Sequence, residues 1–202
     1  MCCDGLGLQS PSWTSSGEVL NPDRSVISRG QGDGCIRYFS RERADGAERV
    51  QSFLSHAFQP KGFCYKDVVQ PFIASDWLRS RPGVKVLKIR PNVTHVAFAM
   101  LQRGWSYPTF AAERKGSAET QMLEGLLAAA RAIERVPGEA VAYDDLVSNP
   151  GVLRAALRRL YPWRLVKAME FEPGFEQAKA SVLSRRSDVT YQRLDQLVRQ
   201  MA

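Results

Sequence analysis

The chain has 202 residues, of which 44% are hydrophobic and 24% charged, and its formal net charge is +7. This length suits a single domain over residues 1–202, and the composition excludes a wholly disordered chain. The positive charge favours anionic partners such as phosphates, sulfates, nucleic acids or acidic lipids, without selecting among them.

The cysteines and histidines show no metal-site pattern. Cys2, Cys3, Cys35 and Cys64 form no C-x-x-C pair, and the chain has two histidines, so we expect reduced thiols and no zinc site. No apolar run is long enough to span a membrane. The start of the chain, "MCCDGLGLQS", lacks the basic and apolar regions of a signal peptide. We therefore expect a cytoplasmic protein without membrane association.

The first eighty residues carry short elements with weak periodicity. Residues 1–10 are too short for an independent helix, and the polar, glycine-containing residues 23–45 predict a loop. Residues 46–58 place apolar side chains on one helical face, residues 62–68 are typical of a buried strand, and residues 70–82 have helical spacing.

The next segments give stronger signals. The run "VKVLKI", residues 84–89, predicts a strand. Residues 92–105 predict a helix with one apolar face, made by Val93, Val96, Ala97, Met100 and Leu101. Residues 117–136 predict the strongest helix, preceded by Ser117 as a capping residue and followed by Pro137-Gly138 as a stop.

The last third continues the alternation. Residues 139–146 predict a strand, residues 150–161 a helix with a basic polar side, and residues 165–202 one or two amphipathic helices, within 173–201. Because strands alternate with helices, we expect an α/β fold whose mainly parallel sheet is flanked by helices. Ligands of such sheets bind at the carboxyl ends of the strands, which directs attention to the turns near Glu18, after Ile89 and after Ala142.

Two of these turns carry candidate chemistry. Arg90 leaves the strand end just before a helix begins, and a helix N-terminus beside an arginine suits a phosphate or sulfate. An ion pair between Arg90 and a neighbouring carboxylate is an equally good interpretation. Glu18 could act as a general base on a hydroxyl, although spacing alone favours a solvated turn residue.

The remaining polar candidates have structural interpretations as well. Asp144-Asp145 could bind a metal, but such a pair more often caps a helix or contacts arginine. His56 and His95 are each expected to be a surface or satisfied core histidine. Trp105 and Tyr107 either line an acceptor site or pack in the core, and core packing is favoured.

Several of these segments, in this order, resemble the sulfotransferase family, in particular its bacterial carbohydrate and trehalose-type branch. The matching segments are "SSGEVLNP" (15–22), "GFCYKDV" (62–68), "VKVLKIRPNVTHVAFAMLQRGW" (84–105) and "EAVAYDDLVSNPGVLRAALRRLYPW" (139–163). The resemblance covers residues 10–165. It rests on the order and spacing of these segments.

The resemblance implies a fold similar to P-loop NTPases and the co-substrate 3′-phosphoadenosine 5′-phosphosulfate. It implies transfer of the sulfuryl group to a hydroxyl of a carbohydrate or other small acceptor. Glu18 would take the acceptor proton, Arg90 would hold the 3′-phosphate, and Lys66 would contact the co-substrate. The family has a serine after the arginine that also binds the 3′-phosphate. Phe98 occupies that register in this chain, and Thr94 is the candidate substitute.

The resemblance also predicts what this sequence lacks. The family's first strand and its phosphate-binding loop have no counterpart, and residues 1–10 correspond to the end of the first helix. Either the sequence is truncated before this loop or the protein is an impaired homologue, and we expect a sulfotransferase only if the loop exists upstream. As given, the chain is expected to be a poor catalyst, because preorganised donors supply much of the rate. A missing strand leaves sheet edges that favour a homodimer.

Two other functions compete with this one. The first is a non-catalytic binding protein on the same fold that recognises an acidic partner or glycan. The second is nucleic-acid binding, which only the net charge of +7 suggests. Because no nucleic-acid-binding motif accompanies the charge, we expect no nucleic-acid partner.

Overall fold

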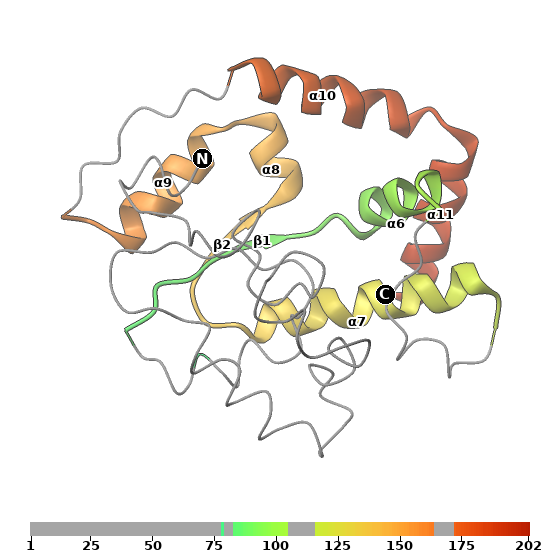
Figure 1. Cartoon of the computed structure of the whole chain (residues 1–202), viewed down its shortest axis with the longest axis horizontal. Coiled ribbons are helices and arrows are strands. Elements are labelled where there is room, and N and C mark those ends of the chain that lie inside the picture. Colours follow the sequence, from blue (N-terminus) through green and yellow to red (C-terminus); the bar gives the residue numbers. More distant parts are fainter. Residues whose placement is uncertain (1–77, 79–82, 105–115, 164–171) are drawn as a thin grey trace, which may run out of the picture. The chain divides into compact units, whose positions relative to one another are not determined.

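The computed structural model describes most of the second half of the chain (Figure 1). The described residues are Leu78, 83–104, 116–163 and 172–202. The chain divides into two compact units, Met1–Val84 with Arg164–Met169 and Lys85–Trp163 with Glu170–Ala202. Nearly all described residues belong to the second unit. The expectation that residues 1–202 form a single domain therefore stays a prediction.

A small parallel sheet organises this second unit. Strand β1 (Leu87–Arg90) pairs with β2 (Glu139–Ala142), in a register that places Leu87 opposite Glu139 and Arg90 opposite Ala142. Helices α6 (Val93–Gln102) and α7 (Ala118–Arg135) lie between the two strands in sequence. A helical crossover of this kind is what two parallel strands require. The α/β prediction is therefore confirmed for the described residues, with a two-stranded parallel sheet and mostly helices.

In the described residues, four further helices follow β2. They are α8 (Tyr143–Ser148), α9 (Gly151–Leu160), α10 (Glu172–Arg186) and α11 (Val189–Met201). Helix α9 contacts both strands, α8 contacts β2, α10 contacts α8, and α11 packs on α6 (Figure 1). The predicted helices over 117–136 and 150–161 are confirmed. Two helices also form over 173–201 as predicted, of which α11 is amphipathic and α10 is not.

Helix α7 shows why the sequence forms it. The Ser117 side chain accepts a hydrogen bond from Thr120 N at 3.1 Å, and Glu119 lies in the first turn, where a negative charge suits the helix dipole. At the other end, Lys88 Nζ donates to the carbonyl oxygens of Glu134 and Val136, both at 2.9 Å. This lysine of β1 therefore caps α7 and fastens it to the sheet.

The predicted strand boundaries were wrong at both strands. The strand predicted over 84–89 begins at Leu87 and includes Arg90. The strand predicted over 139–146 ends at Ala142, because Tyr143–Ser148 is helical. Asp144 and Asp145 occupy the first turn of that helix, where carboxylates interact favourably with the helix dipole. The alternating apolar residues that predicted this strand therefore do not continue into the acidic pair, which belongs to the helix.

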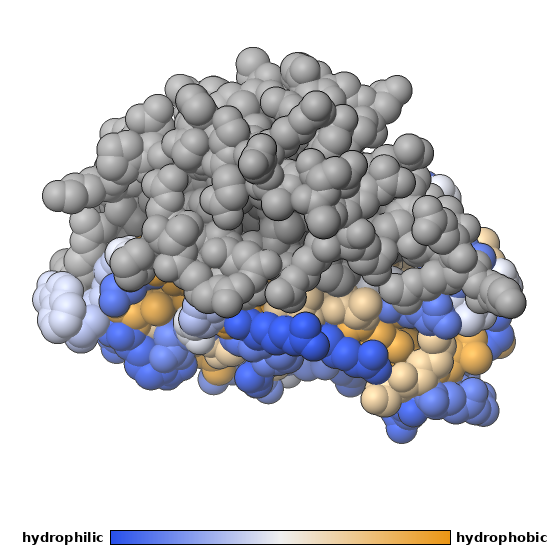
Figure 2. All heavy atoms as spheres, turned by 90° about the horizontal axis from the view of Figure 1, so that it is seen from below, coloured by the Kyte–Doolittle hydropathy of each residue, from blue (hydrophilic) through white to orange (hydrophobic). Residues whose placement is uncertain are grey.

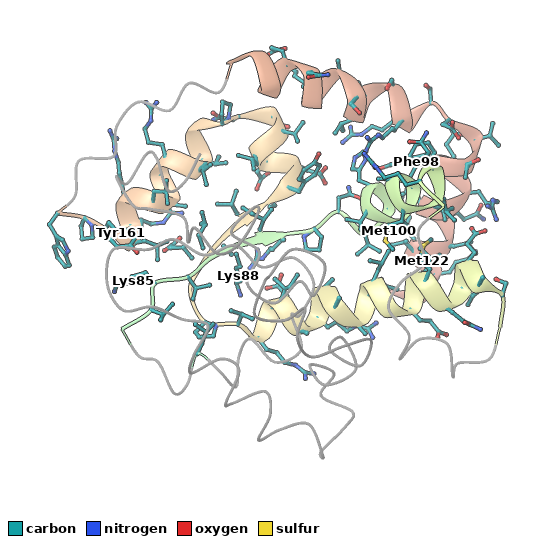
Figure 3. All side chains as sticks on the ribbon, viewed as in Figure 1. Lys85, Lys88, Phe98, Met100, Met122 and Tyr161 are labelled. Atoms are coloured by element: carbon teal, nitrogen blue, oxygen red, sulfur yellow. The ribbon has the colours of Figure 1, made fainter. Side chains whose placement is uncertain are left out.

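The apolar core of this unit lies where α6, α7 and α11 meet. Its buried residues are Val93, Ala97, Phe98, Met122, Leu123, Leu126, Leu127, Tyr191 and Leu194. Figure 3 shows Phe98 and Met100 on α6 near Met122 on α7. The predicted apolar face of α6 was partly wrong, because Thr94 and His95 are buried and Leu101 is 36% exposed. Packing of both α7 and α11 on α6 explains the shift.

Candidate functional site at the carboxyl ends of the strands

The carboxyl ends of β1 and β2 meet at a direct hydrogen bond. Because Arg90 and Ala142 are opposite each other, the residues two positions further on, Asn92 and Asp144, come together. Asn92 Nδ2 donates to Asp144 Oδ2 at 2.9 Å. Asn92 is also the N-cap of α6, since its Oδ1 accepts from His95 N at 3.1 Å. One side chain thus joins both strand ends and starts a helix.

His95 lies next to this bond and is almost fully buried. Its exposed fraction is 4%, and Nε2 lies 3.2 Å from Tyr191 Oη in a hydrogen bond whose donor depends on the tautomer. The same nitrogen is 4.0 Å from Asp144 Oδ1. The ring also packs against Tyr191 and Tyr143, with centroids 4.9 and 5.9 Å away. Within the described part of the chain, His95 Nδ1 and Asp144 Oδ1 are buried atoms without a hydrogen-bond partner.

Charges of both signs surround the imidazole. Burial lowers the pKa of His95 below its ordinary value of 6.5, and this is the largest effect. Asp144 and Asp195 act in the opposite direction, whereas Arg185 and Arg186 lower the pKa further. His95 is therefore neutral at neutral pH. The sequence-based expectation of a core histidine is met in its burial, but its ring is only partly hydrogen-bonded.

Helix α11 supplies the other wall of this cluster. Thr94, which is 2% exposed, donates from Oγ1 to Asp195 Oδ1 at 3.1 Å. Asp195 Oδ2 is in turn 2.7 Å from Arg199 NH2. Burial, followed by the nearby Asp195 carboxylate, raises the pKa of Tyr191 above its ordinary value. The Thr94 hydroxyl, predicted to contact the co-substrate, is thus bonded to α11 in this structure.

Arg90 lies on the face of β1 that packs against α7. Its Nε is 2.8 Å from Glu134 Oε1, and its side chain is 52% exposed. Lys88, two residues earlier, points to the same side, as alternation along a strand requires, and is labelled in Figure 3. Of the two interpretations that the sequence left open for Arg90, the structure shows the ion pair with a neighbouring carboxylate.

Several predicted site residues lie outside the described residues. They are Glu18, the 23–45 loop, His56, Lys66, Trp105 and Tyr107. For the acidic pair, the structure shows Asp144 bonded to Asn92 rather than in a metal cluster. Over the described ranges, the side chains of His, Cys, Asp and Glu form no group of three that could hold a metal ion.

Sequence reasoning missed the partnership of Asn92, His95 and Tyr191. Asn92 carried a usable signal, because an asparagine between a strand and an apolar helix is a typical N-cap. The contact between His95 and Tyr191 spans 96 residues of sequence, so no local pattern could reveal it.

The sheet edge formed by the carboxyl ends of β1 and β2 has buried side chains on its inside and exposed side chains on its outside. His95 and Tyr191 are 4% and 6% exposed, so the described structure offers a substrate little access to either ring. Two arginines lie further out and are about half exposed, each beside a carboxylate: Arg90 Nε is 2.8 Å from Glu134 Oε1, and Arg186 NH2 is 3.9 Å from Asp144 Oδ1. An exposed arginine at a strand end suits an anion that can compete with its carboxylate partner.

Over the described ranges, the surface adds no stronger candidate. In the part of Figure 2 that shows described residues, hydrophilic residues lie beside groups of apolar ones. None of the helices in the described ranges has the length and apolar character needed to cross a membrane. No family model, no curated protein and no solved structure matches this chain.

Proposed function

We propose that this chain is a sulfotransferase-like protein on a P-loop NTPase-like fold. It takes the sulfuryl group of 3′-phosphoadenosine 5′-phosphosulfate and transfers it to a hydroxyl of a carbohydrate or other small acceptor. The observation that carries the proposal is the sequence of elements at the sheet edge. Parallel strand β1 ends at Arg90, and α6 begins at Val93 with its N-terminus at the same edge. This is the arrangement on which the resemblance places the 3′-phosphate.

The ion pair of Arg90 with Glu134 does not prevent phosphate binding. The two side chains are 52% and 50% exposed, and an ion pair this open contributes only about 0.2–1 kcal/mol. A phosphate offers Arg90 the same two parallel charge-assisted hydrogen bonds as a carboxylate, and it carries more negative charge. A bound 3′-phosphate can therefore displace Glu134. Breaking the Arg90–Glu134 ion pair weakens phosphate binding only modestly.

The described groups suited to the phosphate are Arg90 and the first backbone amides of α6. Asn92 Oδ1 already accepts from His95 N, so the amides of Val93 and Thr94 are the early ones left without an intrahelical acceptor. The Thr94 side chain would first have to leave Asp195. The roles of Glu18 as general base and of Lys66 as a co-substrate contact rest on the resemblance alone.

A non-catalytic binding protein on the same fold is the second candidate. The observation that favours it is that Arg90 already pairs with Glu134 and Thr94 already bonds Asp195, both carboxylates of this chain. On this alternative the exposed basic groups of the unit recognise an acidic partner or glycan, and the nucleotide does not bind.

A thermal-shift assay with 3′,5′-adenosine bisphosphate tests the proposal. Ligand at one hundred times its Kd adds about 2.7 kcal/mol to the stability of the folded chain, a clear shift. We expect this shift in the wild type, a shift reduced to about half or less in Arg90→Ala, and a larger shift at equal ligand concentration in Glu134→Gln. Lys85→Ala removes one positive charge from the segment before β1 and should keep the shift. An equal shift in Arg90→Ala would contradict the assigned site.

The two candidates give different results. Absence of any shift at millimolar bisphosphate, combined with retained binding to a sulfated polysaccharide such as heparin, would favour the non-catalytic protein. A shift that Arg90→Ala reduces in this way would favour the sulfotransferase-like protein and make Glu18→Gln the next variant for activity measurements.

A further inference from the structure

His95 is a buried titratable group that the proposed phosphate site does not use. It belongs to α6 and faces ionisable side chains from three other helices. These are Tyr143 and Asp144 of α8, Arg185 and Arg186 of α10, and Tyr191 and Asp195 of α11. A change in the charge of this one ring therefore acts on four helices at once.

The geometry gives the ring a different best partner in each charge state. In the neutral state, Nε2 shares a hydrogen bond with Tyr191 Oη at 3.2 Å, which ties α11 to α6. In the protonated state, Nε2 must carry a proton, and a carboxylate is a stronger acceptor than a phenol. Asp144 Oδ1 lies 4.0 Å from Nε2 and 3.9 Å from Arg186 NH2, and it has no hydrogen-bond partner within the described residues. A small movement of the ring would bring the two together.

We propose that His95 is an acid-sensitive latch between α6 and the C-terminal helices. Neutral His95 holds α11 closed through Tyr191. Protonation moves the hydrogen bond to Asp144 of α8 and loosens α11, together with the Thr94–Asp195 contact beside it. Acid therefore opens the side of α6 that α11 covers at neutral pH.

The surroundings make protonation costly while α11 stays closed. The ring is 4% exposed, and desolvation of a buried imidazolium is the largest contribution to the lowered pKa of His95. Arg185 and Arg186 of α10 repel the added charge, whereas Asp144 and Asp195 attract it. Because the net effect lowers the pKa, opening of the helices and uptake of the proton favour each other.

Amide hydrogen exchange on the full chain tests the latch. Exchange of the α11 amides, Val189–Met201, is measured at pH 7.5 and 5.5 after correction for the intrinsic effect of pH. One linked proton changes an equilibrium by at most about tenfold for each pH unit below the ordinary histidine pKa. We therefore expect protection of α11 to fall by up to about tenfold, while protection of α9, Gly151–Leu160, changes much less.

Two variants separate the latch from general acid sensitivity. His95→Gln keeps a group that can bond Tyr191 but cannot titrate, so the ratio of α11 protection between the two pH values should fall toward one. His56→Gln removes the other histidine of the chain and should leave the ratio as in the wild type. The comparison is made within each variant, so a uniform loss of stability does not affect it.

Direct titration of His95 in the wild-type chain by NMR provides an independent readout. The midpoint of the His95 ring shifts should lie below pH 6.5, and the loss of α11 protection should begin near pH 6.5 and level off at that midpoint. The latch is overturned if His95 in the folded chain titrates at or above pH 6.5, if His95→Gln keeps the wild-type ratio, or if α9 loses protection equally. These outcomes do not depend on whether the bisphosphate binds at Arg90.

Discussion

Asn92 and Asp144, 52 residues apart in sequence, are joined by a 2.9 Å hydrogen bond at the carboxyl ends of the two parallel strands. The same asparagine caps α6, and Asp144 lies in the first turn of α8. This pair therefore connects two strand ends to the starts of the two helices that leave them. The proposed phosphate site and the proposed latch lie on either side of Asn92 in sequence, at Arg90 and His95.

Asn92→Ala should lower the free energy of unfolding by about 1–2 kcal/mol, because it removes an N-cap and a side-chain hydrogen bond together. Urea unfolding monitored by circular dichroism measures the change. Asn92→Ser keeps a capping oxygen and loses only the bond to Asp144, so its effect should be smaller.

Asn92→Asp is the sharper comparison for this pair. Aspartate caps a helix as well as asparagine does, but it would set a second carboxylate against Asp144. We expect Asn92→Asp to be less stable than Asn92→Ser at pH 7. Equal stability of the alanine, serine and aspartate variants would show that neither the helix cap nor the bond to Asp144 stabilises the chain.

Gly138→Ala should destabilise the chain by more than about 2 kcal/mol. Gly138 has a φ of +134°, and an added Cβ would lie 2.4 Å from the backbone oxygen of Val86, which cannot move aside as a flexible side chain would. Gly104→Ala is the matched control, since its φ is +63° and nothing lies within 4 Å of the added Cβ. Differential scanning calorimetry should find the smaller loss at Gly104.

Lys88→Met should cost about 1.5–3 kcal/mol in the free energy of unfolding, the range for hydrogen bonds made by a charged group. The side chain is 11% exposed, and its ammonium bonds the last carbonyls of α7. Methionine fills similar space without these bonds. Lys85→Met, on the exposed residue three positions earlier, should change urea stability by less than about 0.5 kcal/mol. Equal losses in the two variants would contradict the capping role.

Stability should fall as the pH falls below 6.5, and His95 should account for part of the fall. The pKa of His95 is lowered in the folded chain. The unfolded chain therefore binds more protons below pH 6.5, and acid shifts the equilibrium toward it. Urea unfolding at pH 7.5, 6.5 and 5.5 measures the slope, which should be shallower in His95→Gln than in the wild type. A steeper slope in His95→Gln would mean that His95 stabilises the folded chain in acid, which is opposite to the predicted effect.

The elements that the sequence predicted best carry their signals locally. Helix α7 has a capping serine, a continuous apolar stripe and a Pro-Gly stop, and its observed bounds, Ala118–Arg135, lie within one residue of the expected segment. The strand at β2 was extended too far because alternation cannot show where an acidic pair turns the chain into a helix. The buried face of α6 was misplaced because it depends on α11, which comes about ninety residues later.

The residues of the candidate site also divide into those that local sequence signals reveal and those whose contacts depend on tertiary packing. Arg90 after a strand was recognisable, and one of its two foreseen interpretations, the ion pair, is what the structure contains. Its partner Glu134 could not be chosen from the sequence, since the choice depends on which turn of α7 packs over β1. The contacts of Thr94 and His95 with α11 require the tertiary packing of helices distant in sequence.

Binding of a ribose 3′-phosphate by Arg90 and the start of α6 is the step on which the proposed function depends. Isothermal titration of the wild-type chain with 3′,5′-adenosine bisphosphate and with adenosine 5′-monophosphate isolates this step, because the two ligands differ only in that phosphate. We expect the bisphosphate to bind at least about tenfold more tightly, an energy of about 1.4 kcal/mol that one charge-assisted contact can supply. Arg90→Ala should remove the difference. Equal affinities in the wild type, or no binding of either ligand, would contradict the proposed phosphate site.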